Sequence, residues 1–323
     1  MDIPAEPFTC CIFEFLTGHM DKNSADITVA PGKVVFWLVV TTALWGGSFV
    51  FNKIGFREIP PITFLFLRFS LATLLMGIVC LRRFRRFNRT VLKKGMIVGL
   101  ALAAANLSFV LGVSGTTVSR AGFLNNLFVL FIPVICFLFW REKVSRVMFA
   151  GLTLAVAGLW MLARGGSEGF NAGDLMSTVC ALFIALQIIA VSKILHDEDV
   201  YLVTLVQFAT VTLVGGVSFM LFSPPFHSFG GISIGALIYC AVFPTIICFT
   251  LQNTYQRYST PAQAGLIYTL DPIWSMLGGF LLLGERLSGA EWAGCALIFL
   301  GIVLPIGIGR LFERRYLSAK SRI

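Results

Sequence analysis

The sequence predicts an all-α integral membrane protein with ten transmembrane helices, arranged as two inverted five-helix repeats. Of its 323 residues 57% are hydrophobic and 13% are charged, which is too little polar surface to cover a soluble globule. Apolar runs of about 20 residues, enough to cross a hydrocarbon core of about 30 Å as helix, can be read ten times. Residues 121–158 recur without a gap 143 positions later, at 264–301, and such a duplication is typical of secondary transporters.

The predicted spans follow one another with short connections, and their ends are defined to within a few residues. In chain order they cover residues 34–56, 61–81, 95–113, 121–140, 147–163, 175–195, 201–222, 232–252, 262–283 and 290–309. These spans divide the chain into an N-terminal extension (1–32), a first repeat (33–163), a linker (164–174), a second repeat (175–309) and a basic tail (310–323). Met20 is an alternative initiator within the extension.

The repeated segment covers the fourth and fifth spans of the first half and the ninth and tenth of the second. It matches Ala121-Gly122 with Ala264-Gly265, Glu142 with Glu285, Gly151 with Gly294 and Gly158 with Gly301. Because five spans are an odd number, the second half enters the membrane in the opposite sense. Two halves related in this way can open a shared cavity to one side and then to the other. The paired glycines are expected to allow close helix packing.

The Lys and Arg residues that give the formal charge of +9 lie mainly in the predicted loops and the C-terminal tail. With the N-terminus in the cytoplasm, ten spans return the C-terminus there, and most of the 25 Lys and Arg residues fall on the inner side. The largest cluster, at positions 82–94, joins the second and third spans. This positive-inside bias explains the charge as a determinant of topology, so we expect a lipid bilayer and no nucleic acid as partner.

Short motifs follow one another in a fixed order along residues 34–309. They are Ala43-Leu44-Trp45-Gly46-Gly47-Ser48-Phe49, Leu67-Arg68-Phe69, Ala121-Gly122-Phe123-Leu124, Phe131-Ile132-Pro133, Phe243-Pro244-Thr245, Leu251-Gln252-Asn253, Leu270-Asp271-Pro272 and Gly284-Glu285-Arg286-Leu287. In this order and spacing they resemble the EamA-type permeases of the drug/metabolite transporter superfamily. The resemblance implies ten helices in two inverted repeats, an inner-membrane location and transport of small organic metabolites, often export of amino acids or related compounds. The N-terminal extension and the apolar ending Leu304-Pro305-Ile306 depart from the family pattern.

Asp271 is the sharpest candidate for a substrate site, because charged groups inside the bilayer are costly and mark functional positions. It stands about mid-span directly before Pro272, a pair typical of a helix N-cap followed by a first-turn proline. The ninth span is therefore predicted to be discontinuous there. Two interpretations stay open: the carboxyl group caps the broken helix, or it binds substrate and exchanges protons during transport.

Arg68 is the second intramembrane charge. Its guanidinium group suits a substrate carboxylate, and a salt bridge with Asp271 is a further expectation, since both lie at a similar depth. The alternative is a structural arginine that binds backbone carbonyls or joins the halves.

Uncharged polar and aromatic residues within the spans complete the predicted substrate site. Amides can donate and accept hydrogen bonds at once, so several around one cavity would suit a zwitterionic or hydroxylated solute, although each could equally bond between helices. The residues are Trp45, Ser48, Asn106, Asn125, Asn126, Gln187, Gln252 and Tyr268. Asn125 and Asn126 are matched in the second half by Tyr268 and Thr269.

Absent motifs narrow the class of function. The sequence has no P-loop and no His-Glu-x-x-His, so we expect neither ATP use nor enzymatic activity, and no cofactor or metal. A channel, or a membrane anchor that binds a protein partner, is the alternative to a carrier. Gly95 and Gly99 have the spacing of a helix-pairing motif and suggest a homodimer.

Overall fold

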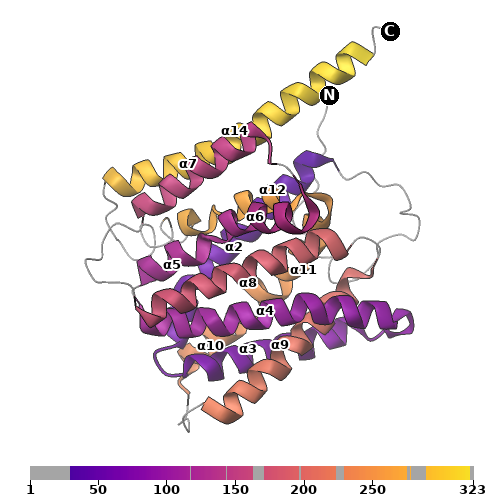
Figure 1. Ribbon diagram of the computed structural model, residues 1–323. Helices are drawn as coiled ribbons and strands as arrows, with labels where there is room; N and C mark the ends of the chain where they lie inside the picture. Colours follow the sequence, from indigo (N-terminus) through magenta and orange to yellow (C-terminus); the bar gives the residue numbers. More distant parts are fainter. Residues whose placement is uncertain are drawn as a thin grey trace.

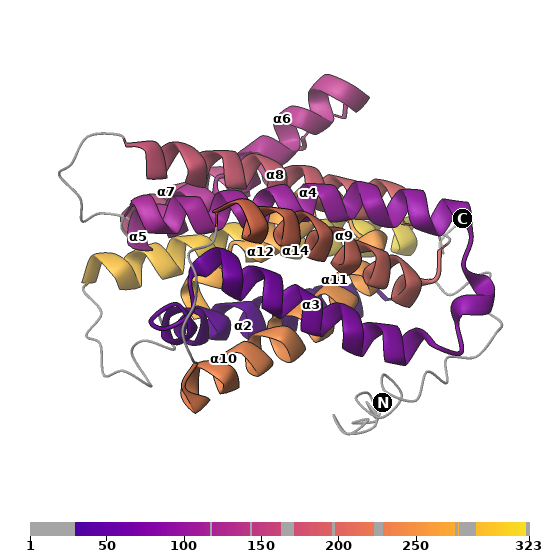
Figure 2. The same ribbon diagram turned by 90° about the horizontal axis from the view of Figure 1, so that it is seen from below.

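The computed structural model of the chain describes residues 30–116, 118–142, 144–162, 171–195, 198–222, 229–274, 277 and 289–320. The long helices run side by side across Figure 1, with α7 and α14 on one face and α3, α9 and α10 on the other (Figures 1 and 2). The helices are α2 (Pro31–Gly55), α3 (Pro61–Cys80), α4 (Arg89–Gly115), α5 (Val118–Asn126), α6 (Phe128–Trp140), α7 (Arg146–Leu162), α8 (Ala172–Ile194), α9 (Val200–Phe222), α10 (Gly231–Ala241), α11 (Cys248–Tyr255), α12 (Pro261–Tyr268) and α14 (Gly289–Lys320). Three short pieces, η1 (Phe84–Arg86), η2 (Val242–Ile247) and η3 (Gln256–Tyr258), connect them.

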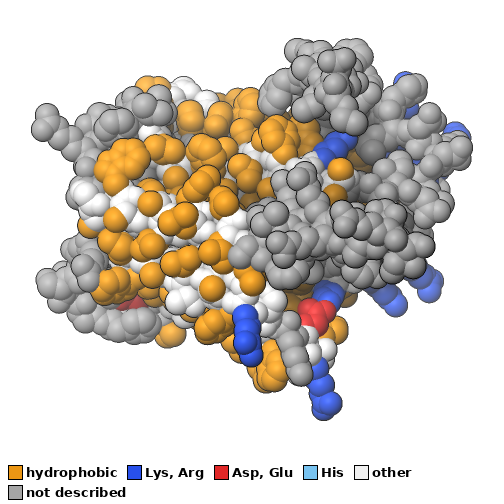
Figure 3. Space-filling view, turned by 90° about the horizontal axis from the view of Figure 1, so that it is seen from above, with side chains coloured by type: hydrophobic (Ala, Val, Ile, Leu, Met, Phe, Trp, Pro, Cys, Tyr) orange, Lys and Arg blue, Asp and Glu red, His pale blue; other side chains and the backbone are white. Residues whose placement is uncertain are grey.

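The chain is an all-helical, multi-pass membrane protein. Among the described residues, six helices are long and apolar enough to cross a bilayer: Pro61–Cys80, Arg89–Val113, Ala121–Trp140, Ala172–Ile194, Val200–Phe222 and Gly231–Tyr258. Three shorter apolar helices cover Pro31–Gly46, Arg146–Met161 and Trp292–Pro305. Hydrophobic side chains cover much of the face in Figure 3, and Leu213 and Met220 are 71% and 84% exposed. Such a surface is expected in lipid.

Most helix ends agree with the predicted spans. The clearest differences are α4, which begins at Arg89 rather than 95, and α14, which continues to Lys320 beyond the predicted end at 309. The predicted basic tail is therefore helical as far as Lys320. The first 29 residues with Met20, positions 164–170 of the linker, and Glu285 lie outside the described residues.

Side chains and prolines fix several helix starts. The Asn88 side chain accepts from Val91 N before α4, and a reciprocal capping box of Asn171 and Asp174 opens α8. These bonds satisfy first-turn N–H groups that have no partner within the helix. Thr260 and Gln263 form a second capping box, with Pro261 in the first turn of α12.

The repeated glycines meet one another where α7 packs against α14. A Cβ added at Gly151 would lie 2.5 Å from the carbonyl oxygen of Gly301, and one at Gly158 equally close to that of Gly294. Because the later residue of α7 meets the earlier residue of α14, the two helices are antiparallel (Figure 1). Because the repeat matches Gly151 with Gly294 and Gly158 with Gly301, each contact is the image of the other. The predicted close packing is confirmed.

Gly95 and Gly99 of α4 pack against α9 of the same chain. A Cβ at Gly95 would meet the Val206 side chain and the Val203 carbonyl oxygen, and one at Gly99 the Thr210 side chain and the Gln207 carbonyl oxygen. Gly95 and Gly99 therefore pack against a helix of the same molecule and not against a second copy. The homodimer itself stays a prediction.

Both halves contain a broken helix at matching positions. Helix α12 ends at Tyr268 and the chain becomes helical again at 271, with Leu270 N donating to Ile267 O and Trp274 N to Leu270 O. In the first half Leu127 N donates to Leu124 O and Phe131 N to Leu127 O, between α5 and α6. Each bond is shifted by 143 residues. The predicted break at Asp271 is confirmed, and the equivalent break at Leu127 was not predicted.

A third irregularity lies between α10 and α11. Pro244 has no N–H, so the carbonyl oxygen of Cys240 loses its helical donor. The Thr245 hydroxyl donates to that oxygen instead, at 2.7 Å, and residues 242–247 form a π-helical segment. Such bulges are often found at functional sites.

Candidate functional site

A buried cluster of hydrogen-bonded amides lies where α8, α11, η3 and α12 meet. Gln187 and Gln252 donate to each other at 3.3 and 3.2 Å, and Gln252 Nε2 also donates to Gln256 Oε1 at 2.8 Å. The Tyr268 hydroxyl donates to the same Gln256 oxygen at 2.9 Å. We call Gln187, Gln252, Gln256 and Tyr268 the amide cluster. It brings together three of the predicted site residues.

Trp45 of α2 closes one side of the amide cluster. Its ring lies 5.3 Å from that of Tyr268 and 5.5 Å from that of Phe249, centroid to centroid. Its indole N–H donates to the carbonyl oxygen of Pro244 at 3.0 Å. A residue of the first half is thus held against the π-helical segment of the second half, and its aromatic faces line the cluster.

Arg68 joins the halves at the same π-helical segment. Its Nε donates to Thr245 Oγ1 at 2.6 Å, and its guanidinium carbon lies 5.6 Å from the centre of the Phe69 ring. Thr245 therefore accepts from α3 and donates to Cys240. The structural role considered for Arg68, pairing of the halves, is confirmed, while its binding of substrate and its salt bridge with Asp271 stay predictions.

Asp271 lies at the start of the helix that resumes after α12. Since Trp274 N donates to Leu270 O, Leu270 is the N-cap residue and Asp271 is the first residue within the helix. The sequence alone predicts Asp271 itself as the N-cap. Nearby, Trp274 Nε1 donates to Thr42 Oγ1 of α2 at 3.0 Å.

Three of the other predicted polar residues bond within their own helices. Asn106 Nδ2 donates to Leu102 O and Asn126 Nδ2 to Gly122 O, both at 2.9 Å, and the Ser48 hydroxyl donates to Trp45 O at 2.6 Å. These bonds do not link helices, in contrast to the pair Gln187 and Gln252. Asn125 and Asn126 are buried at the end of α5.

Sequence reasoning missed Gln256 and passed over Asn253. Gln256 lies four residues after Gln252, a spacing that places both on one helix face, so the signal was present. Asn253 Nδ2 donates to Thr204 Oγ1 at 2.9 Å and to Gln207 Oε1 at 2.8 Å. This second buried polar group ties α11 to α9.

Ion pairs join the two halves at the face that carries the basic loops. Lys193 of α8 pairs with Glu142 after α6, Lys94 with Glu198 at 3.1 Å, and Arg83 with Asp199 at 3.0 Å. We call this end of the molecule the basic face. Each pair takes one residue from each half.

Hydrogen bonds join the halves at the opposite face. Gly230 N donates to Glu58 Oε2 at 2.9 Å, and the Thr116 hydroxyl donates to Asp174 Oδ1 at 2.6 Å. Hydrogen bonds from the Ser233 side chain and the Gly230 backbone lower the pKa of Glu58. The loops paired at each face are those predicted to share a side of the membrane.

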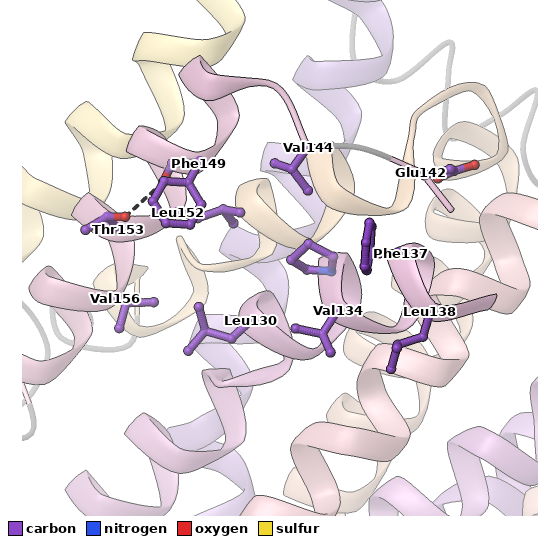
Figure 4. A pocket seen from close by; sticks show the side chains of 11 residues that line it. Leu130, Val134, Phe137, Leu138, Glu142, Val144, Phe149, Leu152, Thr153 and Val156 are labelled. Atoms are coloured by element: carbon purple, nitrogen blue, oxygen red, sulfur yellow. Dashed lines mark hydrogen bonds between the residues drawn. The ribbon is translucent and has the colours of Figure 1, made fainter. Parts of the chain in front are cut away.

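An apolar groove of about 920 Å³ lies apart from this centre, between α6 and α7 (Figure 4). Its walls include Leu130, Val134, Phe137, Phe149 and Leu152, with Glu142 at one end. Several of these side chains are more than half exposed, so the groove faces the lipid rather than the amide cluster.

A multi-pass helical protein with a buried polar centre, and with ionic and hydrogen-bonded contacts between its halves at each face, has the architecture of a membrane transporter. The sequence model of the EamA-like transporter family matches residues 32–164 and 171–306. The chain belongs to this family, and it is a transporter rather than an enzyme.

Of three relatives, two are named only as uncharacterized transporters and one name states what is transported. An uncharacterized transporter of Archaeoglobus fulgidus is 26% identical over 83% of both chains. The uncharacterized inner membrane transporter YedA of Escherichia coli K12 is 25% identical over 81% of this chain and 86% of its own. A protein named "Probable amino-acid metabolite efflux pump" in Salmonella typhimurium is 26% identical over 84% and 94%. One crystal structure shares the fold with a TM-score of 0.73 at 20% identity, covering 88% of this chain and 100% of that one.

Proposed function

We propose that this chain is a secondary carrier that exports small polar organic metabolites, amino acids or related compounds, by alternating access between two inverted five-helix repeats. The observation that carries the proposal is the reciprocal glycine contact between α7 and α14. Gly151 contacts Gly301, and their counterparts in the repeat, Gly294 and Gly158, contact each other as well. A two-fold axis between the two antiparallel helices therefore relates the two contacts. Such an axis supports two halves that exchange conformations.

The contacts between halves at the two faces are the elements that would break and reform. In the proposed cycle the basic face lies in the cytoplasm, together with both chain ends. Opening to the cytoplasm separates Lys193 from Glu142, Lys94 from Glu198 and Arg83 from Asp199. Opening to the other side separates Glu58 from Gly230 and Thr116 from Asp174. A change of state then exchanges one set of polar contacts for another.

We place the substrate between the halves, at the amide cluster and its neighbours. Arg68 would bind a carboxylate, and Asp271 would line the same site and exchange protons during transport. The uncharged part of the site is formed by Trp45, Ser48, Asn106, Asn125, Asn126, Gln187, Gln252 and Tyr268. Mixed donors and acceptors between two opposite charges suit zwitterionic solutes.

Location and direction are part of the proposal. The positive-inside distribution of Lys and Arg supports cytoplasmic ends in a cytoplasmic membrane, and YedA is named an inner membrane transporter. Export rests on the relative named as an efflux pump.

Counterflow in sealed proteoliposomes tests the proposal. Each amino acid of a panel is loaded inside, uptake of its labelled form is followed, and wild type is compared with Asp271→Asn at two pH values. We expect transient accumulation of one class of solute, lost or made independent of pH in the variant. Accumulation unchanged by the variant would keep the carrier and return Asp271 to a structural role. Non-saturable flux would indicate a channel, and absence of flux from folded protein would favour a membrane anchor.

A further inference from the structure

Two buried amide oxygens at the break between α5 and α6 accept no hydrogen bond. Asn125 and Asn126 are 7% and 6% exposed, and within the described part of the chain neither Oδ1 has a donor. Buried polar atoms are almost always paired, because removal from water without a partner costs free energy. Two neighbouring exceptions therefore point to a missing donor.

The orientation of Asn126 is fixed. Its Nδ2 donates to Gly122 O at 2.9 Å, so a flipped amide would set two oxygens against each other. Its Oδ1 thus remains an acceptor. Gly122 and Asn126, four residues apart, lie on one face of α5.

The face of α5 that carries Asn126 is open one helical turn earlier, at Gly122. No described atom lies within 4 Å of the place that a Cβ on Gly122 would take. At the matching position of the second half, Gly265 is covered by Ile132, with Phe128 at 3.9 Å. The space is therefore particular to the first half.

The end of α5 adds acceptors of the same kind. The last carbonyl groups of a helix have no partner within it and carry the negative end of its dipole. Two amide oxygens together with one such carbonyl would match the three N–H donors of a primary ammonium group. A metal cation needs about six oxygens, more than this group offers.

We infer that Asn125 and Asn126 form a subsite for the ammonium group of the transported solute, so that the substrate class is primary amines. This inference rests on the proposed function and narrows it. Acylation of the amine removes both the charge and two of the three donors, and an N-acylated solute would be carried poorly.

Thermal unfolding of the purified protein with ethylammonium chloride tests the subsite without transport. Ethanol and sodium chloride serve as matched probes, because a bound ligand raises the midpoint in proportion to its affinity. We expect ethylammonium to stabilise the wild type, with an apparent Kd weakened about tenfold or more in Asn125→Leu/Asn126→Leu. Asn126→Asp should tighten it. Thr153→Val, which also loses a bond to a carbonyl four residues earlier, should bind like the wild type.

The midpoint without probe separates binding from support of the fold. Replacement of unpaired buried oxygens by apolar groups does not lower stability. The double variant should therefore lose only the hydrogen bond from Asn126 Nδ2 to Gly122 O and match Thr153→Val, which loses an equivalent bond. A larger loss would show that the two amides support the fold. Equal stabilisation of wild type and double variant by ethylammonium would overturn the inference. So would stabilisation by sodium chloride alone, which would indicate a metal ion.

Counterflow with free and N-acetylated amino acids completes the test. A free-amine preference that the double variant loses supports the subsite. Equal transport of both forms, unaffected by the variants, overturns the subsite and keeps the carrier. Ethylammonium binding in a protein that transports nothing keeps the subsite and rejects the carrier.

Discussion

Lys193, at the end of α8, forms an ion pair with Glu142 in the connection between α6 and α7. Its ammonium group also lies 5.7 Å from the centre of the Trp140 ring. The two side chains are 28% and 44% exposed, and pairs as accessible as this contribute only about 0–1 kcal/mol. In the proposed cycle this contact between the halves opens, and so small an energy would allow it to do so.

Glu142→Gln should therefore loosen the basic face without unfolding the protein. We expect backbone hydrogen exchange to rise up to about fivefold around Glu142 and Lys193, the factor that corresponds to about 1 kcal/mol. Lys193→Met should behave alike. The charge exchange Glu142→Lys/Lys193→Glu should recover most of the protection, and failure to do so would show that the attraction between the charges is not what holds this face.

Gly151→Ala should destabilise the protein strongly, because its methyl group would lie 2.5 Å from the carbonyl oxygen of Gly301. Separation of α7 from α14 is expected to cost about 1–3 kcal/mol, measured as the free energy of unfolding in detergent. Gly77→Ala in α3 is the matched control, since no described atom lies within 4 Å of its added Cβ. Equal losses in both variants would argue against a special contact.

Thr245→Val should cost about 1.5–3 kcal/mol of stability, because Arg68 loses a buried acceptor and Cys240 O loses the hydroxyl that replaces the missing donor of Pro244. Thr245→Ser keeps the hydroxyl and should lose far less. Thermal unfolding of the two variants distinguishes a hydrogen-bond effect from a packing effect, since equal losses would implicate the methyl group.

The contact of Glu58 should weaken in acid. Hydrogen bonds from Ser233 and Gly230 lower the pKa of Glu58 from its ordinary value of 4.5, so its stabilising effect is present above that value. The effect disappears as pH falls through the lowered pKa. The unfolding midpoint of wild type should therefore approach that of Glu58→Gln below pH 4.5. A gap that stays constant on acidification would exclude the carboxylate as its cause.

Hydropathy and the internal duplication predicted most of the fold. The lengths of the apolar runs predicted the spans. The matched glycines predicted a close contact, because small residues allow two helices to approach each other. Asp271-Pro272 predicted one helix break, since proline removes a donor. At the matching break, Leu127-Phe128 carries no such signal. Gly95 and Gly99 misled because spacing does not tell which helix will cover them.

The residue types within the spans predicted which side chains belong to the polar centre. They did not predict which partner each side chain binds. Gln187 and Gln252 could be recognised as polar groups within spans, but their mutual pairing depends on how α8 meets α11. Arg68 was predicted as an intramembrane charge, whereas its bond with Thr245 requires the π-helical segment that Pro244 causes. Local sequence thus predicts which groups are costly in lipid, and the arrangement of the helices decides how each is satisfied.

The two matching breaks are not mechanically equivalent. Pro272 has no N–H, so the hydrogen bond to the carbonyl oxygen of Tyr268 that would join α12 to the helix after it can never form. Its counterpart is Val129, whose N–H is free of that restriction, and the whole stretch from Ala121 to Trp140 is apolar enough to form one uninterrupted span. The break in the second half therefore cannot be closed by backbone hydrogen bonding, whereas nothing in the backbone chemistry of Val129 prevents closure of the break in the first half. Two copies of one duplicated segment have thus become chemically unequal at the same position.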